Sequence, residues 1–101
     1  MNLEEYGYSI MVKLWSFKDK GPPRIYHGVN KIEDIPIINF KDIMWFAFMK
    51  DGKEIAGAKQ TDVDTYITYT GNDGSFQKKY FDPDTESLPS LIQSLPPWIW
   101  N

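Results

Sequence analysis

The chain has 101 residues, of which 42% are hydrophobic and 25% charged, and its formal net charge is −3 at pH 7. This composition is that of an ordinary globular protein, so we expect one domain over residues 1–101. The sequence contains no cysteine, which excludes disulfides, thiolate zinc sites and cysteine nucleophiles. We see neither a signal-peptide pattern nor an apolar run of the roughly 20 residues that a membrane helix needs. We therefore expect a cytoplasmic protein without a membrane partner.

The charge is unevenly distributed along the chain. Residues 1–61 hold 8 acids and 9 bases, whereas residues 62–101 hold 6 acids and 2 bases. The only arginine is Arg24, and arginine is the side chain that most often recognises phosphate and guanine. Aromatic residues make up 16% of the chain and could stack on bases, but such platforms work beside a basic groove. The charge distribution therefore argues against a nucleic-acid partner.

The N-terminal part of the sequence predicts a hairpin. Residues 8–17 alternate with a two-residue period, which is typical of a strand with two different faces. The face predicted to enter the core carries Tyr8, Ile10, Val12 and Leu14. Residues 18–23, "KDKGPP", have the composition of a turn, and residues 24–29, "RIYHGV", can return antiparallel.

A short irregular segment is expected between this hairpin and the next strand. Asn30 followed by Glu33 resembles a helix capping box, and Pro36 stops any longer helix. We expect a single helical turn or a loop that lies over the sheet. Its apolar cover would come from Ile32, Ile35 and Ile37.

Residues 43–49, "IMWFAFM", are seven consecutive apolar residues that lead to Asp51-Gly52, a strong signal for a two-residue hairpin turn. Such a turn would pair Phe46 with Gly57. One face of the strand, with Met44, Phe46 and Phe48, is then predicted to be core. The other face needs a cover of its own, and it carries Ile43, Trp45, Ala47 and Met49.

A further hairpin is predicted where "GNDG", residues 71–74, separates two runs rich in aromatic and β-branched residues. A turn centred on Asn72-Asp73 and one centred on Asp73-Gly74 give registers that differ by one residue. We favour the second, which pairs Ile67 with Tyr80.

The chain is predicted to end in a short helix and an aromatic tail. Leu88, Leu91, Ile92 and Leu95 recur at helical spacing after Ser87, a plausible N-cap, and Pro96-Pro97 ends the helix. We expect Trp98 or Trp100 to pack against the Trp45 face or, in the same way, on another protein chain. The whole pattern predicts an α+β fold, mainly β, with a single antiparallel curved sheet of about five or six strands and a short C-terminal helix.

Catalysis is not indicated by any motif. His27 is the only histidine, and no serine occurs in a nucleophile-elbow pattern. Asp62 with Asp64 and Asp82 with Asp84 could act in pairs, but we interpret both pairs as solvated charges at a strand entry and a turn. We expect no enzyme, no metal site and no cofactor.

The function that these features favour is that of a small non-enzymatic protein-binding module, such as an inhibitor or antitoxin-like protein that occludes a site on its partner. The partner would be another protein or a second copy of the chain. Candidate partner-binding residues are Trp45, Asp62, Asp64, Tyr66, Trp98 and Trp100. The alternative is a small-ligand-binding protein with an aromatic pocket around Trp45, Tyr66 and Tyr69. A closed aromatic cavity would favour the ligand, and a flat or convex apolar patch would favour the protein.

Overall fold

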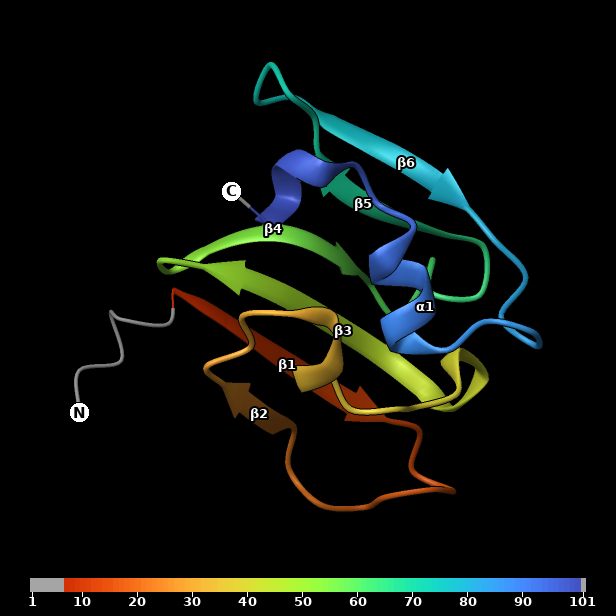
Figure 1. Cartoon of the computed structure of the whole chain (residues 1–101). Helices are drawn as coiled ribbons and strands as arrows, with labels where there is room; N and C mark the ends of the chain where they lie inside the picture. The colour runs from red at the N-terminus through yellow and green to blue at the C-terminus, as the bar shows by residue number, and fades with distance from the viewer. Residues whose placement is uncertain (1–6, 101) are drawn as a thin grey trace.

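The computed structural model describes residues 7–100, which form one open six-stranded antiparallel sheet with the order β2-β1-β3-β4-β5-β6 (Figure 1). The strands are β1 (Tyr8–Leu14), β2 (Arg24–His27), β3 (Ile43–Lys50), β4 (Lys53–Ala58), β5 (Tyr66–Thr70) and β6 (Phe76–Tyr80). The described residues hold a single α-helix, α1 (Leu88–Gln93), near the C-terminus, and the predicted fold class is confirmed.

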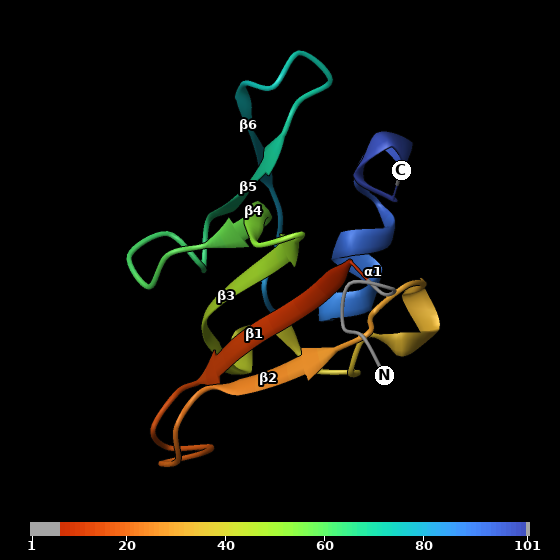
Figure 2. The ribbon, with the colours of Figure 1, turned by 90° about the vertical axis from the view of Figure 1, so that its left-hand side faces the viewer.

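The non-strand segments gather on one side of the sheet. The chain leaves β2 at an edge, crosses the sheet through η2 (Ile32–Asp34) and η3 (Phe40–Asp42), and enters β3 on the far side of β1. Figure 2 shows this crossing, α1 and η4 (Pro97–Trp100) on the same side of a strongly twisted sheet. We call the side that they cover the inner face and the opposite side the outer face.

The core lies between the inner face and these covering segments. Phe46 and Phe48 of β3 are 2% and 0% exposed, and Phe40 of η3 packs its ring edge against Phe46 with 5.5 Å between the ring centroids. The buried set also includes Ile10, Val12, Ala56, Ala58, Ile67, Leu88, Leu91, Ile92, Leu95 and Ile99. The predicted core face of the first strand and the apolar stripe of the C-terminal helix are confirmed.

The β3–β4 hairpin has the predicted turn but not the predicted register. Asp51 and Gly52 both have positive φ, 51° and 83°, and the strands then shift by one residue at Ile55. Phe46 therefore lies opposite Ala58, and the predicted pairing of Phe46 with Gly57 is wrong. The extra residue, Ile55, forms a β-bulge, and both Ile55 and Ala56 consequently contact the core.

A second irregularity lies between β1 and β3. Lys13 pairs with Trp45, but the next residue, Leu14, pairs with Ile43, so Met44 is an extra residue in β3. Ile43 is consequently 1% exposed within the core. Its predicted place on the face of Trp45 is wrong, because the bulge turns it to the inner face.

The β5–β6 hairpin has neither of the two turns that we considered. Gly71 N–H donates to the Ser75 carbonyl oxygen at 2.6 Å, which closes a three-residue loop, and Gly74 in this loop has a φ of 88°. Tyr66 is thus paired with Tyr80, and Ile67 with Lys79. Because side chains alternate along a strand, the side chains of Phe76, Lys78 and Tyr80 share the outer face with those of Tyr66 and Thr68.

The crossing segment, residues 28–42 between β2 and β3, contains the expected helical turn, but the predicted cap is wrong. Lys31 occupies the N-cap of η2 without a side-chain hydrogen bond, and the backbone N–H of Asn30 instead donates to the Asp34 carboxylate at 3.1 Å. Ile35 is buried, as predicted, whereas Ile37 is 87% exposed and covers nothing.

The C-terminal segment folds back onto the sheet, but on the inner face. Ser87 and Ser90 form a capping box at the start of α1, and Pro97 opens η4 at once, because proline suits the first position of a helical turn. The ring of Trp100 packs on those of Tyr8 and Phe48, with centroids 5.2 and 5.3 Å away. Trp98 donates its indole N–H to the Thr70 carbonyl at 2.8 Å.

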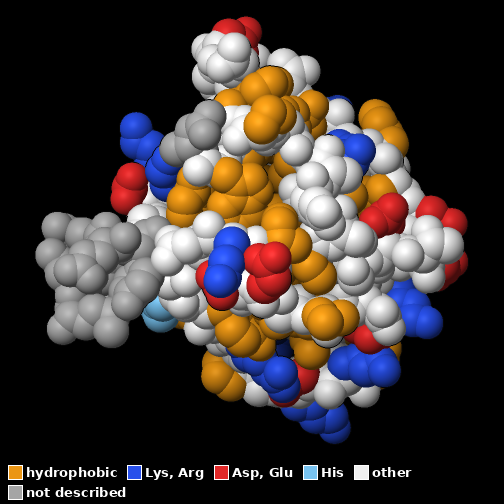
Figure 3. Space-filling view, viewed as in Figure 1, with side chains coloured by type: hydrophobic (Ala, Val, Ile, Leu, Met, Phe, Trp, Pro, Cys, Tyr) orange, Lys and Arg blue, Asp and Glu red, His pale blue; other side chains and the backbone are white. Residues whose placement is uncertain are grey.

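The expectation that Trp98 or Trp100 covers the Trp45 face is therefore wrong. Viewed from the inner side, the space-filling surface still shows hydrophobic side chains gathered around the C-terminal segment (Figure 3). The tail thus extends the cover of the inner face and does not reach the outer one.

Replacing Phe46 with alanine tests the assignment of the inner face. We expect Phe46→Ala to lower the free energy of unfolding by about 3–5 kcal/mol, measured by urea denaturation, because the substitution leaves a cavity against Phe40. Trp45→Ala, on the outer face of the same strand, is the control and should cost less. A loss below about 1 kcal/mol for Phe46→Ala would show that the core lies on the other face.

Deleting residues 98–101 tests the role of the tail. The deletion removes Trp100 from Tyr8 and Phe48, so we expect the melting temperature to fall by several degrees, since about 1 kcal/mol corresponds to roughly 4–8 °C in a domain of this size. An unchanged melting temperature would mean that the tail contributes nothing to the core.

Candidate functional site

A groove of about 400 Å³ lies on the outer face, between the middle of the sheet and the loop that joins β4 to β5. It is open to solvent on one side. We call it the Trp45 groove and define it by six of its lining residues, Trp45, Ala47, Glu54, Gly57, Asp62 and Tyr66.

The floor of the groove is made of small residues, which is why the sheet is hollowed there. Ala47 is paired directly with Gly57, so neither strand raises a large side chain at this pair. A Cβ atom on Gly57 would lie 2.8 Å from the carbonyl oxygen of Phe46 and 3.2 Å from the carboxyl carbon of Glu54. The Glu54 carboxylate therefore lies beside the bare backbone of Gly57.

A second carboxylate, that of Asp62, is placed at the groove by a helical turn in the β4–β5 loop. The Asp62 carbonyl accepts from the backbone N–H groups of Thr65 and Tyr66 at 2.8 and 3.0 Å, and the neighbouring Val63 is buried. Within residues 7–100 the two ion pairs, Lys18 with Asp42 and Arg24 with Asp19, involve neither groove carboxylate.

The aromatic surface continues from the groove to the edge of the sheet. The ring centroids of Tyr66 and Tyr80 are 5.5 Å apart, and the Lys78 ammonium lies 4.7 Å from the centroid of the Tyr66 ring. Phe76 and Tyr80 on the edge strand are 64% and 66% exposed. Aromatic side chains thus extend from Trp45 on β3 to the free edge at β6.

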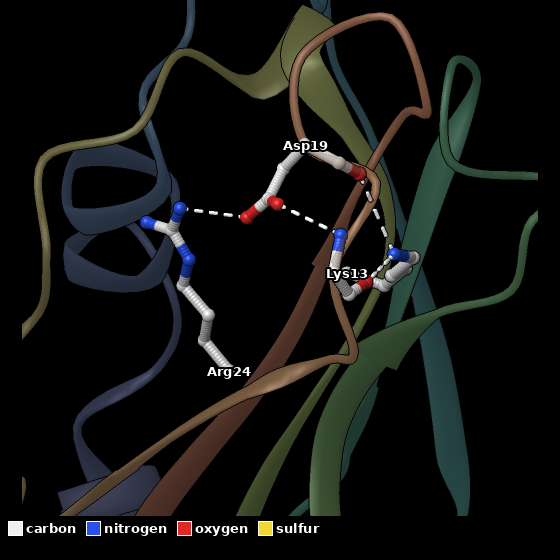
Figure 4. Close-up of polar contacts among 4 residues, drawn as sticks. Lys13, Asp19 and Arg24 are labelled. Carbon is white, nitrogen blue, oxygen red and sulfur yellow. Dashed lines mark hydrogen bonds and ion pairs between the residues drawn. The ribbon is translucent and has the colours of Figure 1, made fainter.

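Lys13 neighbours Trp45 on the outer face, but its charge is held by the β1–β2 loop. Its ammonium donates to the carbonyl oxygens of Asp19 and Gly21 (Figure 4). The Asp19 carboxylate accepts from the Gly21 N–H at 2.9 Å and pairs with Arg24 at 2.6 Å. The Gly21 hydrogen bond and then the Arg24 guanidinium hold the pKa of Asp19 below its ordinary value, because both favour the ionised carboxylate.

The structure brings three of the six predicted partner-binding residues together, namely Trp45, Asp62 and Tyr66. Asp64 instead lines a separate hollow beside Trp15, where its carboxylate accepts from the Thr65 hydroxyl at 3.2 Å. Trp98 and Trp100 lie on the inner face, as described above.

The pocket predicted around Trp45, Tyr66 and Tyr69 is not formed, because Tyr69 packs against the inner core. Sequence reasoning missed Glu54 and the edge aromatics Phe76 and Tyr80. The even spacing of Phe76 and Tyr80 in "FQKKY" puts them on the same face of a strand and was the available signal. Which face of the sheet that is depends on the length of the β5–β6 loop.

The described part of the chain holds neither a cluster of metal ligands nor a membrane-spanning helix. Between residues 7 and 100, no three acidic, histidine or cysteine side chains come together as a metal site would require. None of the helices in this range is long and apolar enough to cross a membrane.

Comparison of the chain with protein-family models, with curated proteins and with solved structures gives no match. A functional proposal must therefore rest on the residues of this chain.

Alanine at position 57 tests the floor of the groove. We expect Gly57→Ala to lower the free energy of unfolding by about 1–3 kcal/mol in urea denaturation, because the added methyl group must displace the Phe46 backbone and the Glu54 side chain. A change within about 0.5 kcal/mol would show that β4 does not approach β3 as described.

Proposed function

We propose that this protein is a small non-enzymatic binding module that binds another protein through the outer face of its sheet. The observation that carries the proposal is the aromatic surface from the Trp45 groove to β6, which the covering segments among residues 7–100 leave open. Tryptophan and tyrosine are enriched at the energetic centres of protein interfaces, because they bury much area at little conformational cost.

The shape of the groove favours a protein over a small ligand. The Trp45 groove, about 400 Å³, has the volume of a small ligand pocket, but it is only partly enclosed, whereas ligand pockets usually enclose about 70–90% of the surface of their ligand. Tyr66, which lines the groove, packs on Tyr80 of the edge strand, and Phe76 is exposed further along the same strand, so aromatic surface extends beyond the groove. A partner that covers this surface would have its own site occluded, as an inhibitor or antitoxin-like protein requires.

The arrangement of the polar groups supports binding over catalysis. Asp62 lines the groove and Asp64 a different hollow, so the two carboxylates do not face one substrate. His27 lies exposed on the edge strand β2, on the far side of β1 from the groove. We propose that the protein acts in the cytoplasm, with which a chain without cysteine is compatible.

Affinity purification from the native host with matched variants tests this function. We expect the wild-type chain and Trp98→Ala to retain the same partner protein, and Trp45→Ala combined with Tyr66→Ala to lose it. Circular dichroism should confirm that all three chains are folded. With the purified partner, calorimetry should show binding at least about tenfold weaker for the double variant, which corresponds to about 1.4 kcal/mol.

Two outcomes would contradict the proposal. Equal retention of the partner by the outer-face double variant would place the binding surface elsewhere on the protein. Sedimentation of the purified chain as a dimer that the double variant abolishes would show that the outer face binds a second copy instead.

A further inference from the structure

We propose that the Trp45 groove receives a positively charged side chain, lysine or arginine, from the partner protein. This inference rests on the proposed function, since it names the chemistry that the partner must present to the outer face. It follows from the charges and the aromatic rings that line the groove.

Two acidic residues line the Trp45 groove. Glu54 and Asp62 reach the groove from β4 and from the β4–β5 loop, and neither forms an ion pair within residues 7–100. The Glu54 carboxylate lies against Gly57, where no side chain separates it from the groove floor. A cation in the groove would thus meet two carboxylates that form no ion pair with any other residue in the range 7–100.

Two aromatic residues, Trp45 and Tyr66, also line the groove. The faces of tryptophan and tyrosine rings attract cations, and this attraction grows when the cation is partly desolvated. Tyr66 already shows this chemistry within the chain, because the Lys78 ammonium lies 4.7 Å from its ring centroid. Trp45 and Tyr66 line the groove together with the small residues Ala47 and Gly57, which leave room for the long apolar stem of a lysine or arginine.

The cations around the groove must be weighed against this attraction. Lys59 lines the groove and is exposed, and Lys78 lies over Tyr66 on the neighbouring strand. Lys13, which is paired with Trp45, is held by the carbonyl oxygens of its own loop. Lys59 and Lys78 therefore oppose a cation in the groove, and removing Lys78 should favour a bound cation.

Charge also selects a basic partner over a second copy of this chain. The charged residues that line the groove are Glu54, Asp62 and Lys59, so acids outnumber bases there. In a symmetric dimer that brings the two grooves together, the groove carboxylates of the two copies would lie near one another, and like charges at close distance oppose association. A basic surface on another protein would instead be attracted and oriented.

Titration with a model side chain tests the inference directly. The probe is N-acetyl-lysine methylamide, and its neutral control is N-acetyl-norleucine methylamide, followed by ¹H–¹⁵N correlation spectra at low salt. We expect the lysine probe to shift the indole signal of Trp45 and the backbone signals of Gly57 and Asp62, and to bind at least about threefold more tightly than the neutral control.

Charge variants locate the effect. Glu54→Gln and Asp62→Asn should each weaken binding of the lysine probe by about two- to fivefold, the range typical of exposed charge pairs. Asp64→Asn removes the same charge two residues from Asp62 but outside the groove, and it should change binding little. Lys78→Gln should tighten binding, because it removes a like charge and a competitor for the Tyr66 ring.

The inference is overturned if the two probes bind equally, if the lysine probe shifts no groove signal, or if Asp64→Asn weakens binding as much as Asp62→Asn. These results can be told apart from failure of the proposed function. If the partner is lost with the Trp45 and Tyr66 double variant but retained with Glu54→Gln combined with Asp62→Asn, the outer face binds a protein without using a cation. If the lysine probe binds in the groove while the aromatic double variant keeps its partner, the cation site exists and the proposed protein-binding function fails.

Discussion

Burial of Phe46 and Phe48 on the inner face is the constraint on which the rest of the structure depends. These rings need small residues opposite them on β4, and the bulge at Ile55 provides Ala58 and Ala56 in those positions. The same bulge turns Gly57 to the outer face beside Ala47, where it forms the floor of the groove between Trp45 and Tyr66. Packing on one face of the sheet thus shapes the site on the other.

The second consequence concerns which face is covered. The inner face is closed by the crossing segment, by α1 and by the tail, whose Trp100 packs on Tyr8 and Phe48. These segments leave the outer face open, with its aromatic residues in a row toward β6. The apolar residues of β3 therefore divide between the two faces: Phe46 and Phe48 stabilise the fold, and Trp45 lies on the outer face, where we propose that it contacts a partner.

Local patterns in the sequence predicted much of the fold. Two-residue alternation identified β1, the positive φ demanded at Gly52 identified the β3–β4 turn, and Ser87 marked the start of α1. Registers were less predictable, because an extra residue such as Ile55 or Met44 is selected by packing across the whole sheet. For the site, aromatic and acidic composition indicated Trp45, Asp62 and Tyr66, whereas Glu54 reaches the groove only through the bulged strand.

Hydroxyl-radical footprinting with mass spectrometry tests most directly whether the outer face is open and the inner face closed, because it compares the same residue type on both faces. In the free protein, Phe76 and Tyr80 on the outer face should be modified at least about tenfold faster than Phe46 and Phe48, which are nearly inaccessible to solvent. Modification of Trp45 should be intermediate, and it should fall when a partner is bound. Equal protection of Phe76, Tyr80 and Phe46 in the free monomer would contradict the account, because the outer face would then be covered within the chain itself.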